Sequence, residues 1–483
     1  MRGIPFKSWL LPIAVAALFT AGCRGAGVGS SPAIPFGGAQ RREAPIDPLH
    51  RGPLDKIKHI IIIIQENRSF NNLFNGYRGA KTTKIGRIST GAEVALQPVD
   101  LKTSWDLQHN AGAFFLSCNG SGTIHGTDCK MNGFNKEQWT CRQVGRPKCP
   151  DKYPPYSYVP RDQVLPYFVM AHQYVLADQF YASDFDISSF ESHQYIIAGV
   201  NPNSTVNYPL TIWGCPGGPT DKIAKLSKDR RISQQPIVVP CWSPDTLGKE
   251  LDKKGISWAF YASPVKGIAT KYDCGGKGPD ISKGRAGLWS AYQAIAYICY
   301  GSDWDKDVIS PSTQFLTDVK NGALRSVTWI TPTYANSDHG GNDSDTGPSW
   351  VASLVNAVGK SPFWDSTAIF IFWDDPGGWY DPEPPKYLDN DGLGLRLPLL
   401  IISPYAKQGF VSHTHYEHGS ILRFVEDRFD LPQLGASDTR ANSPEKFAFD
   451  FSKGPRTFVP IKAKYPEEFF LNQPLDMQPP DND

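Results

Sequence analysis

The sequence predicts an α/β fold with a mostly parallel central sheet, helices on both faces and disulfide-stapled loop insertions. Short apolar runs recur along the chain and are continuous rather than alternating, as expected for strands that are buried on both faces. Segments with helical character separate these runs. Strands that alternate with helices form mostly parallel sheets, because each helix crosses over to start the next strand in the same direction.

The expected strands are of strand length and rich in β-branched and aromatic residues, which favour a pleated and buried environment. They span residues 57–64, 256–261, 327–330, 368–373 and 397–402. The expected helices span residues 160–173, 243–254, 311–320, 349–359 and 418–429. Pro311 and Pro348 fall where a first helical turn tolerates proline, and Gly359 suits a helix end.

The composition is that of a globular protein. With 40% hydrophobic and 20% charged residues, the 483-residue chain can bury a sizeable core, which argues against a disordered, collagen-like or polytopic membrane protein. Its 49 Lys and Arg residues balance 48 Asp and Glu residues, which leaves a net charge of +1. We therefore expect no nucleic-acid partner.

The N-terminus predicts export. Arg2 and Lys7 precede an apolar run over residues 9–19 that ends in small residues, which is the order found in secretion signals. The run is too short to span a bilayer as a permanent helix. We expect residues 1–22 to be a signal peptide.

Small residues stand directly before Cys23 and resemble a bacterial lipoprotein cleavage site, although Thr20 stands where such sites usually carry Leu. A lipidated Cys23 would anchor the protein in the periplasm or at the cell surface, and plain secretion is the alternative. Residues 23–55 lack periodicity and are expected to form a tether. The catalytic domain is then expected over residues 56–454, followed by a Pro-rich tail over residues 455–483.

The other cysteines predict disulfides. Of nine cysteines, Cys23 belongs to the expected anchor, which leaves eight, an even number typical of disulfides in an exported chain. No C-x-x-C spacing occurs among them, so a thiolate metal site is not expected. They fall into two groups, and we expect pairing within each: Cys118, Cys129, Cys141 and Cys149, and Cys215, Cys241, Cys274 and Cys299.

Polar residues follow the expected strands at their carboxyl ends, where open α/β sheets bind ligands. Glu66 and Asn67 follow one strand, and Asp374 and Asp375 follow another. If these strands are neighbours, three carboxylates and an amide meet at one edge of the sheet. Such groups repel each other unless a cation is present, and they suit one hard divalent ion such as Mg²⁺, Ca²⁺ or Mn²⁺. The alternative is that Glu66 or Asp374 only caps the helix or turn that follows.

Three motifs resemble those of the bacterial phosphoesterase family that contains phospholipases C and exported acid phosphatases. They are IKHIIIIIQENRSF at residues 57–70, WDDPGGWYD at 373–381 and YEHGSILRFVE at 416–426. The resemblance covers most of residues 56–445. It implies an alkaline-phosphatase-like fold and a metal held by the residues that match the family's ligands, which are Glu66, Asn67, Asp374 and Asp375.

The resemblance also implies a serine nucleophile. The family places it ahead of an aromatic-rich segment that ends in a small residue and Gly, and this position falls on Ser189 in the segment 184–199. Ser188 and Ser192 are neighbouring alternatives. A hydroxyl fits this role because a metal-activated alkoxide attacks phosphorus at neutral pH.

Three histidines, His109, His339 and His418, match histidines of the family. The resemblance implies that they bind phosphate oxygens or protonate the leaving group. Asp338 precedes His339 and is expected to orient its ring. His193 lies four residues after Ser189, so a helix there would turn it toward the same site.

An alternative metal site is a cluster of His413 and His415 with His418. The chain also departs from the family in two places. Pro382 stands where the family commonly has a histidine after Tyr-Asp, which puts any role of that histidine in doubt. Residues 444–483 are too few for the C-terminal β domains that many of the phospholipases carry.

Together these features predict an exported, metal-dependent hydrolase of phosphate monoesters, similar to acid phosphatases. Phospholipase C activity on phospholipid head groups is the alternative within the same chemistry. A non-catalytic surface binding protein on the same fold is the alternative from another class. A sulfatase-like reaction is disfavoured because the sulfatase maturation motif is missing.

Overall fold

The computed structural model describes residues 52–478, apart from 142–149, 151, 187, 207–212, 266–271 and 276–284. The expected signal peptide and the lipidation site at Cys23 lie outside the described residues. The chain divides into a unit over residues 1–50 and a unit over residues 51–483, and the described residues belong to the second unit. No helix within these described residues is both long and apolar enough to cross a membrane.

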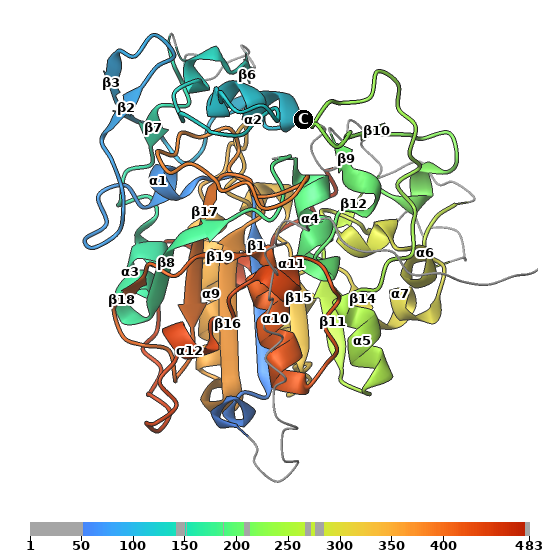
Figure 1. The fold of residues 1–483 in the computed structure, drawn as a ribbon. Coiled ribbons are helices and arrows are strands. Elements are labelled where there is room, and N and C mark those ends of the chain that lie inside the picture. The colour runs from blue at the N-terminus through green and yellow to red at the C-terminus, as the bar shows by residue number, and fades with distance from the viewer. Residues whose placement is uncertain are drawn as a thin grey trace, which may run out of the picture. The chain divides into compact units, whose positions relative to one another are not determined.

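One large sheet organises the second unit (Figure 1). In spatial order, its strands within the described residues are β14 (Val308–Ile309), β11 (Trp258–Tyr261), β15 (Val327–Ile330), β1 (His59–Gln65), β16 (Thr367–Trp373), β17 (Arg396–Ile402), β8 (Val175–Tyr181) and β18 (Phe410–Ser412), with β19 (Tyr416–Glu417) also paired to β8. Only β17 runs against the rest, because it pairs antiparallel with both β16 and β8. The predicted α/β class with a mostly parallel sheet is confirmed.

Every strand expected from the sequence is present, but the seven-residue β8 and the short strands β14, β18 and β19 were missed. The sequence of β8 is VLADQFY, and all seven residues are buried. Asp178 and Gln179 interrupt the apolar run that would otherwise have marked a strand. Asp178 is tolerated inside because its carboxylate accepts hydrogen bonds from the Lys81 backbone N–H and from His413 Nδ1.

The expected helices are α3 (Leu165–Gln173), α5 (Leu247–Lys253), α8 (Gln314–Lys320), α9 (Gly347–Gly359) and α10 (His418–Phe429). Three of them begin three to five residues later than predicted, because the proline-containing segments before them are not helical. In α5 the start is fixed by Thr246, whose hydroxyl accepts a hydrogen bond from Lys249 N. Two further helices, α2 (Ala111–Cys118) and α4 (Ser189–Ala198), were not predicted as elements.

Helices cover both faces of the sheet. The helix α10 packs against α4, and α4 packs against α5, while α9 packs against α3 and α8. Figure 1 shows α10 and α5 in front of the strands. Between the two layers, Ile60 to Ile64 of β1 are at most 1% exposed. Burying one such side chain contributes about 1.5–3 kcal/mol, so this strand is a major part of the core.

Short elements complete the unit. The small helices are α1 (Phe70–Leu73), α6 (Ala296–Cys299), α7 (Ser302–Asp307), α11 (Ser437–Arg440), α12 (Glu445–Ala448) and α13 (Glu467–Leu471). The two-stranded pairs are β2 (Ile85–Arg87) with β3 (Glu93–Ala95), β4 (Gln97–Pro98) with β7 (Ser157–Tyr158), β5 (Trp105–Leu107) with β6 (Trp139–Cys141), β9 (Thr205–Val206) with β10 (Ala224–Lys225), and β12 (Pro264–Val265) with β13 (Arg285–Ala286). In Figure 1 several of these pairs lie above the sheet, on the side toward which β1 runs.

The disulfides pair within the two predicted groups. The bonds join Cys118 to Cys129, Cys215 to Cys241, and Cys274 to Cys299. Cys149 lies outside the described residues, so its expected pairing is not described. Each bond closes a short stretch of chain in the loops around the sheet, and such crosslinks typically contribute about 2–4 kcal/mol to stability.

Candidate active site

The site lies where β1 and β16 end. These strands are parallel neighbours, and their last residues, Gln65 and Trp373, stand opposite each other in the ladder. The Asp374 N–H continues the ladder by donating to the Gln65 carbonyl at 3.0 Å. Glu66 and Asp374 therefore leave the sheet side by side, as the sequence predicted for neighbouring strands.

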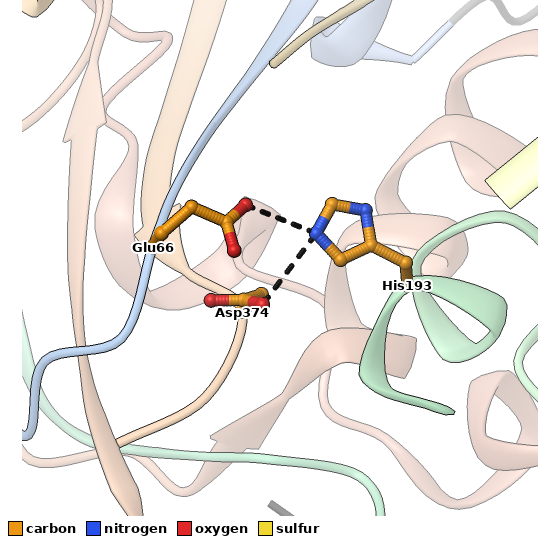
Figure 2. Close-up of side chains that lie close together, drawn as sticks. All are labelled: Glu66, His193 and Asp374. Atoms are coloured by element: carbon orange, nitrogen blue, oxygen red, sulfur yellow. Dashed lines mark hydrogen bonds and ion pairs between the residues drawn. The ribbon is translucent and has the colours of Figure 1, made fainter. Parts of the chain in front are cut away.

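Glu66 and Asp374 meet an imidazole from α4 (Figure 2). His193 Nε2 lies 3.2 Å from Glu66 Oε1 and 3.5 Å from Asp374 Oδ2. One potential ligand atom from each of the three residues lies within 4.8 Å of the other two, and all three residues are buried. The three side chains have the composition and spacing of a metal-binding triad.

The electrostatics of the triad fit a cation. Burial opposes the ionisation of Asp374, but the contact with His193 outweighs it and lowers the pKa of this carboxyl. Beside the triad, Asn67 Oδ1 is buried and accepts no hydrogen bond from any described residue. Buried oxygen atoms are normally paired, and an amide oxygen without a partner next to two carboxylates suits a bound cation.

Ser189 begins α4 beside this triad. Its hydroxyl donates to Asp375 Oδ2 at 3.1 Å, and the same carboxylate oxygen accepts from Asn67 Nδ2 at 3.1 Å. Asn67 Nδ2 also lies 3.4 Å from Ser189 Oγ. The four predicted ligands thus lie in one site: Glu66 and Asp374 belong to the triad, while Asn67 and Asp375 contact the serine.

The two alternative serines face other groups. The Ser188 hydroxyl donates to Asp186 at 2.8 Å, and the Ser192 hydroxyl donates to Asp184 at 3.4 Å. Of the three serines, only Ser189 contacts Asn67 and Asp375 in the described contacts. The helical spacing of four residues places His193 on the same side of α4 as Ser189, as expected.

The backbone around the serine depends on two special conformations. Asn67 has a left-handed φ of 60°, which is uncommon outside glycine and is often found at functional sites. The turn after Asp375 packs directly against it, because a Cβ atom on Gly377 would lie 2.3 Å from the Asn67 carbonyl oxygen. The Gly377 N–H in turn donates to Asp375 Oδ1 at 2.7 Å. Glycine at 377 is therefore required to position both Asn67 and Asp375.

His109 is held in one tautomer. Its Nδ1 lies 2.7 Å from the Leu107 carbonyl oxygen, which can only accept, so Nδ1 carries the proton. Its Nε2 then accepts from Asn67 Nδ2 at 2.6 Å. His109 therefore joins the serine site through Asn67, as a neutral imidazole.

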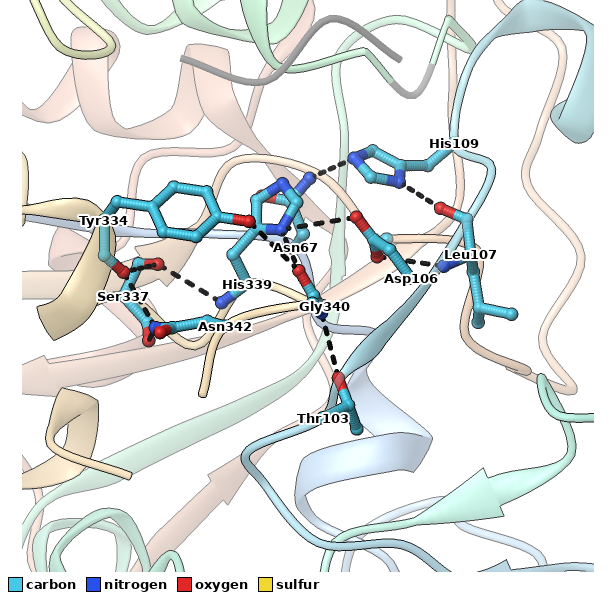
Figure 3. A network of polar contacts seen from close by, with 12 residues as sticks. Asn67, Thr103, Asp106, Leu107, His109, Tyr334, Ser337, His339, Gly340 and Asn342 are labelled. Carbon is cyan, nitrogen blue, oxygen red and sulfur yellow. Dashed lines mark hydrogen bonds and ion pairs between the residues drawn. The ribbon is translucent and has the colours of Figure 1, made fainter. Parts of the chain in front are cut away.

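His339 lies next to His109, with ring centroids 5.3 Å apart (Figure 3). Its Nδ1 donates to the Gly340 carbonyl and lies 3.5 Å from Asp106 Oδ2. Asp106 was not singled out from the sequence, because a lone aspartate in a short strand carries no recognisable motif. Its carboxylate lies 3.5 Å from the His339 ring nitrogen.

Asp338, which was expected to orient His339, points into the core instead. Its Oδ2 accepts from Tyr167 at 2.8 Å and from Trp373 Nε1 at 3.1 Å. Burial raises the pKa of this carboxyl to about 6. The described contacts give Asp338 the role of joining its loop to α3 and β16.

His418 opens α10 and is buried against the rings of Phe180 and Phe372. Burial lowers its pKa to about 3, so the ring is neutral. The Ser183 N–H lies 3.5 Å from its Nδ1. The described contacts do not join His418 to Ser189 or Asp375, so its predicted contact with the phosphoryl group stays a prediction.

The suggested cluster of His413, His415 and His418 finds no support. His413 contacts Asp178 at 2.8 Å, and His415 stacks on Tyr181 with ring centroids 4.7 Å apart. Among the described residues, the one group with metal-binding spacing is the triad of Glu66, His193 and Asp374.

Tyr380 and Asp381 precede Pro382, which stands where the family commonly has a histidine. In this structure Asp381 has a structural role. Asp381 accepts two hydrogen bonds from Arg396, both at 3.0 Å, and one from Asn71 N. Both side chains of the ion pair are fully buried. This pair fixes the segment after the Gly-Gly turn to β17 and α1.

Comparisons with known proteins agree with the motifs. A family model described as "Phosphoesterase family" matches residues 57–432. The chain is 26% identical to the non-hemolytic phospholipase C of Burkholderia pseudomallei over 439 residues, which cover 80% of this chain and 58% of that protein. It is 23% identical to phospholipase C B of Mycobacterium tuberculosis, with 79% and 75% covered, and 23% identical to non-specific phospholipase C1 of Arabidopsis thaliana, with 84% and 73% covered. The chain thus spans little more than half the length of the first of these relatives.

Solved structures are similar only at a low level. Ps i-CgsB in complex with k-i-k-neocarrahexaose is 9% identical, with a TM-score of 0.38 and with 80% of this chain and 74% of that chain covered. A protein in the alkaline phosphatase superfamily from Vibrio parahaemolyticus is 11% identical, with a TM-score of 0.36 and with 80% and 71% covered. Such TM-scores support no conclusion about this chain.

Proposed function

The chain belongs to the Phosphoesterase family, as its three motifs predicted, and we propose from this that it hydrolyses phosphoric ester bonds with Ser189 as the nucleophile. One observation carries the proposal: the Ser189 hydroxyl donates to Asp375 at 3.1 Å, beside the triad of Glu66, His193 and Asp374. A serine that begins a helix, contacts a carboxylate and adjoins a metal-binding triad has what phosphoryl transfer needs.

In the proposed first step, Ser189 Oγ forms a bond to phosphorus while the bond from phosphorus to the ester oxygen breaks. Asp375 Oδ2 accepts the hydroxyl proton, since it already accepts that hydrogen bond. The leaving oxygen gains that proton from Asp375, directly or through water, and is released as an alcohol. Water then attacks the phosphoserine, which releases phosphate and restores the serine.

Several groups would stabilise the charge that builds up on the phosphoryl oxygens. Ser189 is the first residue of the ten-residue α4, whose N-terminus carries a partial positive charge. Asn67 Nδ2 lies 3.4 Å from Ser189 Oγ and 2.6 Å from His109 Nε2, and the His109 and His339 rings are 5.3 Å apart. These groups are proposed to bind and orient the phosphoryl oxygens.

Glu66, Asp374 and His193, with Asn67 and Asp375 beside them, would hold a divalent ion, which would supply positive charge beside the serine oxygen. The predicted ions were Mg²⁺, Ca²⁺ and Mn²⁺, which suit oxygen ligands. The imidazole of His193 also admits transition metals, because nitrogen ligands suit them.

Phosphate monoesters are the first proposed substrates, on the strength of the WDDPGGWYD motif at residues 373–381. Phospholipase C activity is the second candidate, and a specific observation favours it: the relatives named above are all phospholipases C. Both reactions use the same attack on phosphorus, so the site geometry fits either one.

The experiment that tests the function measures hydrolysis of p-nitrophenyl phosphate, its bis ester and phosphatidylcholine. The wild-type chain is compared with Ser189→Ala and Asp374→Ala, and Ser192→Ala is the matched control because Ser192 faces Asp184. We expect turnover of one ester class to be lost in both site variants and retained in the control. Wild-type inactivity on all three esters would contradict the proposal and favour a non-catalytic binding protein.

We also propose that the chain is exported and that Cys23 is lipidated, on the pattern of residues 1–23. Expression in a bacterial host with a radiolabelled fatty acid tests this directly. Label on the wild-type chain and not on Cys23→Ala is the expected result. A processed chain without label would instead indicate plain secretion.

A further inference from the structure

A second cavity lies at the edge of the sheet, away from the active site. Its volume is about 550 Å³, and its walls come from the turn over residues 75–79, from α3 with Arg161, and from the turn before β18. We call it the edge pocket. In the sheet order β16-β17-β8-β18, three strand spacings separate β18 from β16, the strand that Asp374 directly follows. At about 4.8 Å per spacing, this separation is roughly 14 Å.

The edge pocket is lined by two guanidinium groups and an imidazole. Arg78, Arg161 and His172 all contribute to its walls, and their side chains are exposed to solvent. No carboxylate belongs to its lining within the part of the chain that the structure describes, and neither arginine has an ion pair there. The two guanidinium groups on one cavity repel each other, so an anion placed between them would be bound favourably.

The floor of the edge pocket is aromatic and fixed by the core. The rings of Tyr77 and Phe168 lie 5.4 Å apart, and Phe168 also stacks on Phe74 at 5.3 Å. The Arg161 guanidinium lies over the Phe168 ring, 5.2 Å from its centroid. Because Phe168 is only 7% exposed, this floor is held in place before any ligand binds.

Two glycines shape the rim. Gly79 has a φ of +89° beside Val411, and Gly409 has a φ of +57° where a Cβ atom would lie 3.1 Å from the His172 carbonyl oxygen. Both turns therefore approach α3 and β18 closely. The volume falls within the range of about 300–1,000 Å³ that small-molecule sites occupy, and it exceeds what a single tetrahedral anion needs.

We propose that the edge pocket binds a phosphate-bearing ligand at a site separate from the catalytic one. The phosphate oxygens contact Arg78, Arg161 and His172, and the organic part lies on Tyr77 and Phe168. Guanidinium groups suit this role because they donate paired hydrogen bonds to phosphate oxygens. Inorganic phosphate and a phospholipid head group share this chemistry.

The test is calorimetric titration of the full chain carrying Ser189→Ala, which prevents turnover. The probes are inorganic phosphate and dihexanoylphosphatidylglycerol below its micelle concentration. The variant R78Q/R161Q removes two charges from the pocket. The matched control is R87Q/R231Q, because those arginines are exposed and pair with Glu93 and Asp229 elsewhere on the surface.

For at least one probe, we expect R78Q/R161Q to bind one molecule fewer per chain than the Ser189→Ala parent, or to bind that probe at least tenfold more weakly. We expect R87Q/R231Q to bind both probes as the parent does. Loss for phosphate alone identifies the free anion as the ligand, and loss for the lipid alone identifies a head group. The proposal is overturned if the parent and R78Q/R161Q bind both probes equally, or if neither chain binds either probe.

Thermal unfolding checks that the variants are folded. The single variant Arg78→Glu repeats the test with one exposed side chain changed.

Discussion

At the scale of single residues, the site separates into two connected groups. Glu66, Asp374 and His193 form the triad, while Ser189 and Asp375 form the pair that is proposed to start the reaction. The motifs predicted four of these five residues as site residues, because each follows a strand or matches a family position. His193 was expected to face the site only if its segment was helical, and α4 fulfils that condition.

The sequence could not assign the carboxylate that contacts His339. Adjacency in the chain pointed to Asp338, but a residue directly before a histidine in a loop often points the opposite way. Asp338 turns toward Tyr167 and Trp373, and Asp106 from a distant strand takes the place beside the ring. Such a contact depends on how loops pack, which no local pattern encodes.

The triad makes a direct prediction about metal affinity. We expect His193→Gln to bind the activating divalent ion at least tenfold more weakly than the wild type, because one ligand of the triad is lost. Ser192→Ala, one residue earlier on α4, should bind it normally. Calorimetric titration of the metal-free chains measures both, and normal affinity in His193→Gln would show that His193 is not a ligand.

At the scale of elements, the register of β1 with β16 and the first turns of α4 place the chemistry. Continuous apolar runs predicted the buried strands correctly, because burial on both faces leaves no polar alternation. The same rule missed β8, where Asp178 is buried with hydrogen-bond partners from loops distant in sequence. It also could not show that β17 runs antiparallel, since direction depends on the connection rather than on composition.

The Gly-Gly turn after β16 is expected to be essential. In Gly377→Ala, the new methyl group would lie 2.3 Å from the Asn67 carbonyl oxygen, so Asn67 and Asp375 must shift and activity should fall at least tenfold. Gly435→Ala is the matched control, because Gly435 also has a positive φ of +85° but no atom within 4 Å. The control should lose only about 1–2 kcal/mol of stability from the left-handed backbone. Equal activity in the two variants would show that close packing at 377 is unimportant.

The packing of α10 against α11 predicts a pH effect on stability. Burial, with Asp438 nearby, raises the pKa of Glu426 to about 8 from an ordinary value of 4.5. The unfolded chain then releases this proton at lower pH than the folded chain, so Glu426 lowers stability as the pH rises from about 4.5 to 8. We expect Glu426→Gln to raise the melting temperature more at pH 8 than at pH 5. A difference that is the same at both pH values would contradict this assignment.

At the scale of the whole molecule, one sheet with two helix layers carries the active site at the ends of its strands and the edge pocket at one margin. The alternation of strands and helices along the sequence correctly predicted the α/β class of this fold. The loop regions were predicted less well, because they are held by disulfides and by short strand pairs whose partners come from separate segments of the chain.

Metal binding should stabilise the whole unit, because the candidate ligands follow β1 and β16 and lie in α4, so a bound ion would join these elements. A ligand present at 100 times its Kd stabilises the folded state by about 2.7 kcal/mol. Adding EDTA to the metal-loaded wild type should therefore lower the melting temperature measurably. Glu66→Gln, which lacks one ligand, should be much less sensitive to EDTA, and an equal response would place the stabilising ion elsewhere.

If Ser189 attacks phosphorus, a covalent phosphoserine intermediate forms during turnover and can be trapped. The wild-type chain is mixed with p-nitrophenyl phosphate, quenched in acid within the first turnover and analysed by peptide mass spectrometry. The account predicts a phosphoryl group on Ser189, with none on the same peptide of Ser189→Ala. Phosphorylation of Ser188 or Ser192 instead, or full turnover by Ser189→Ala, would contradict it.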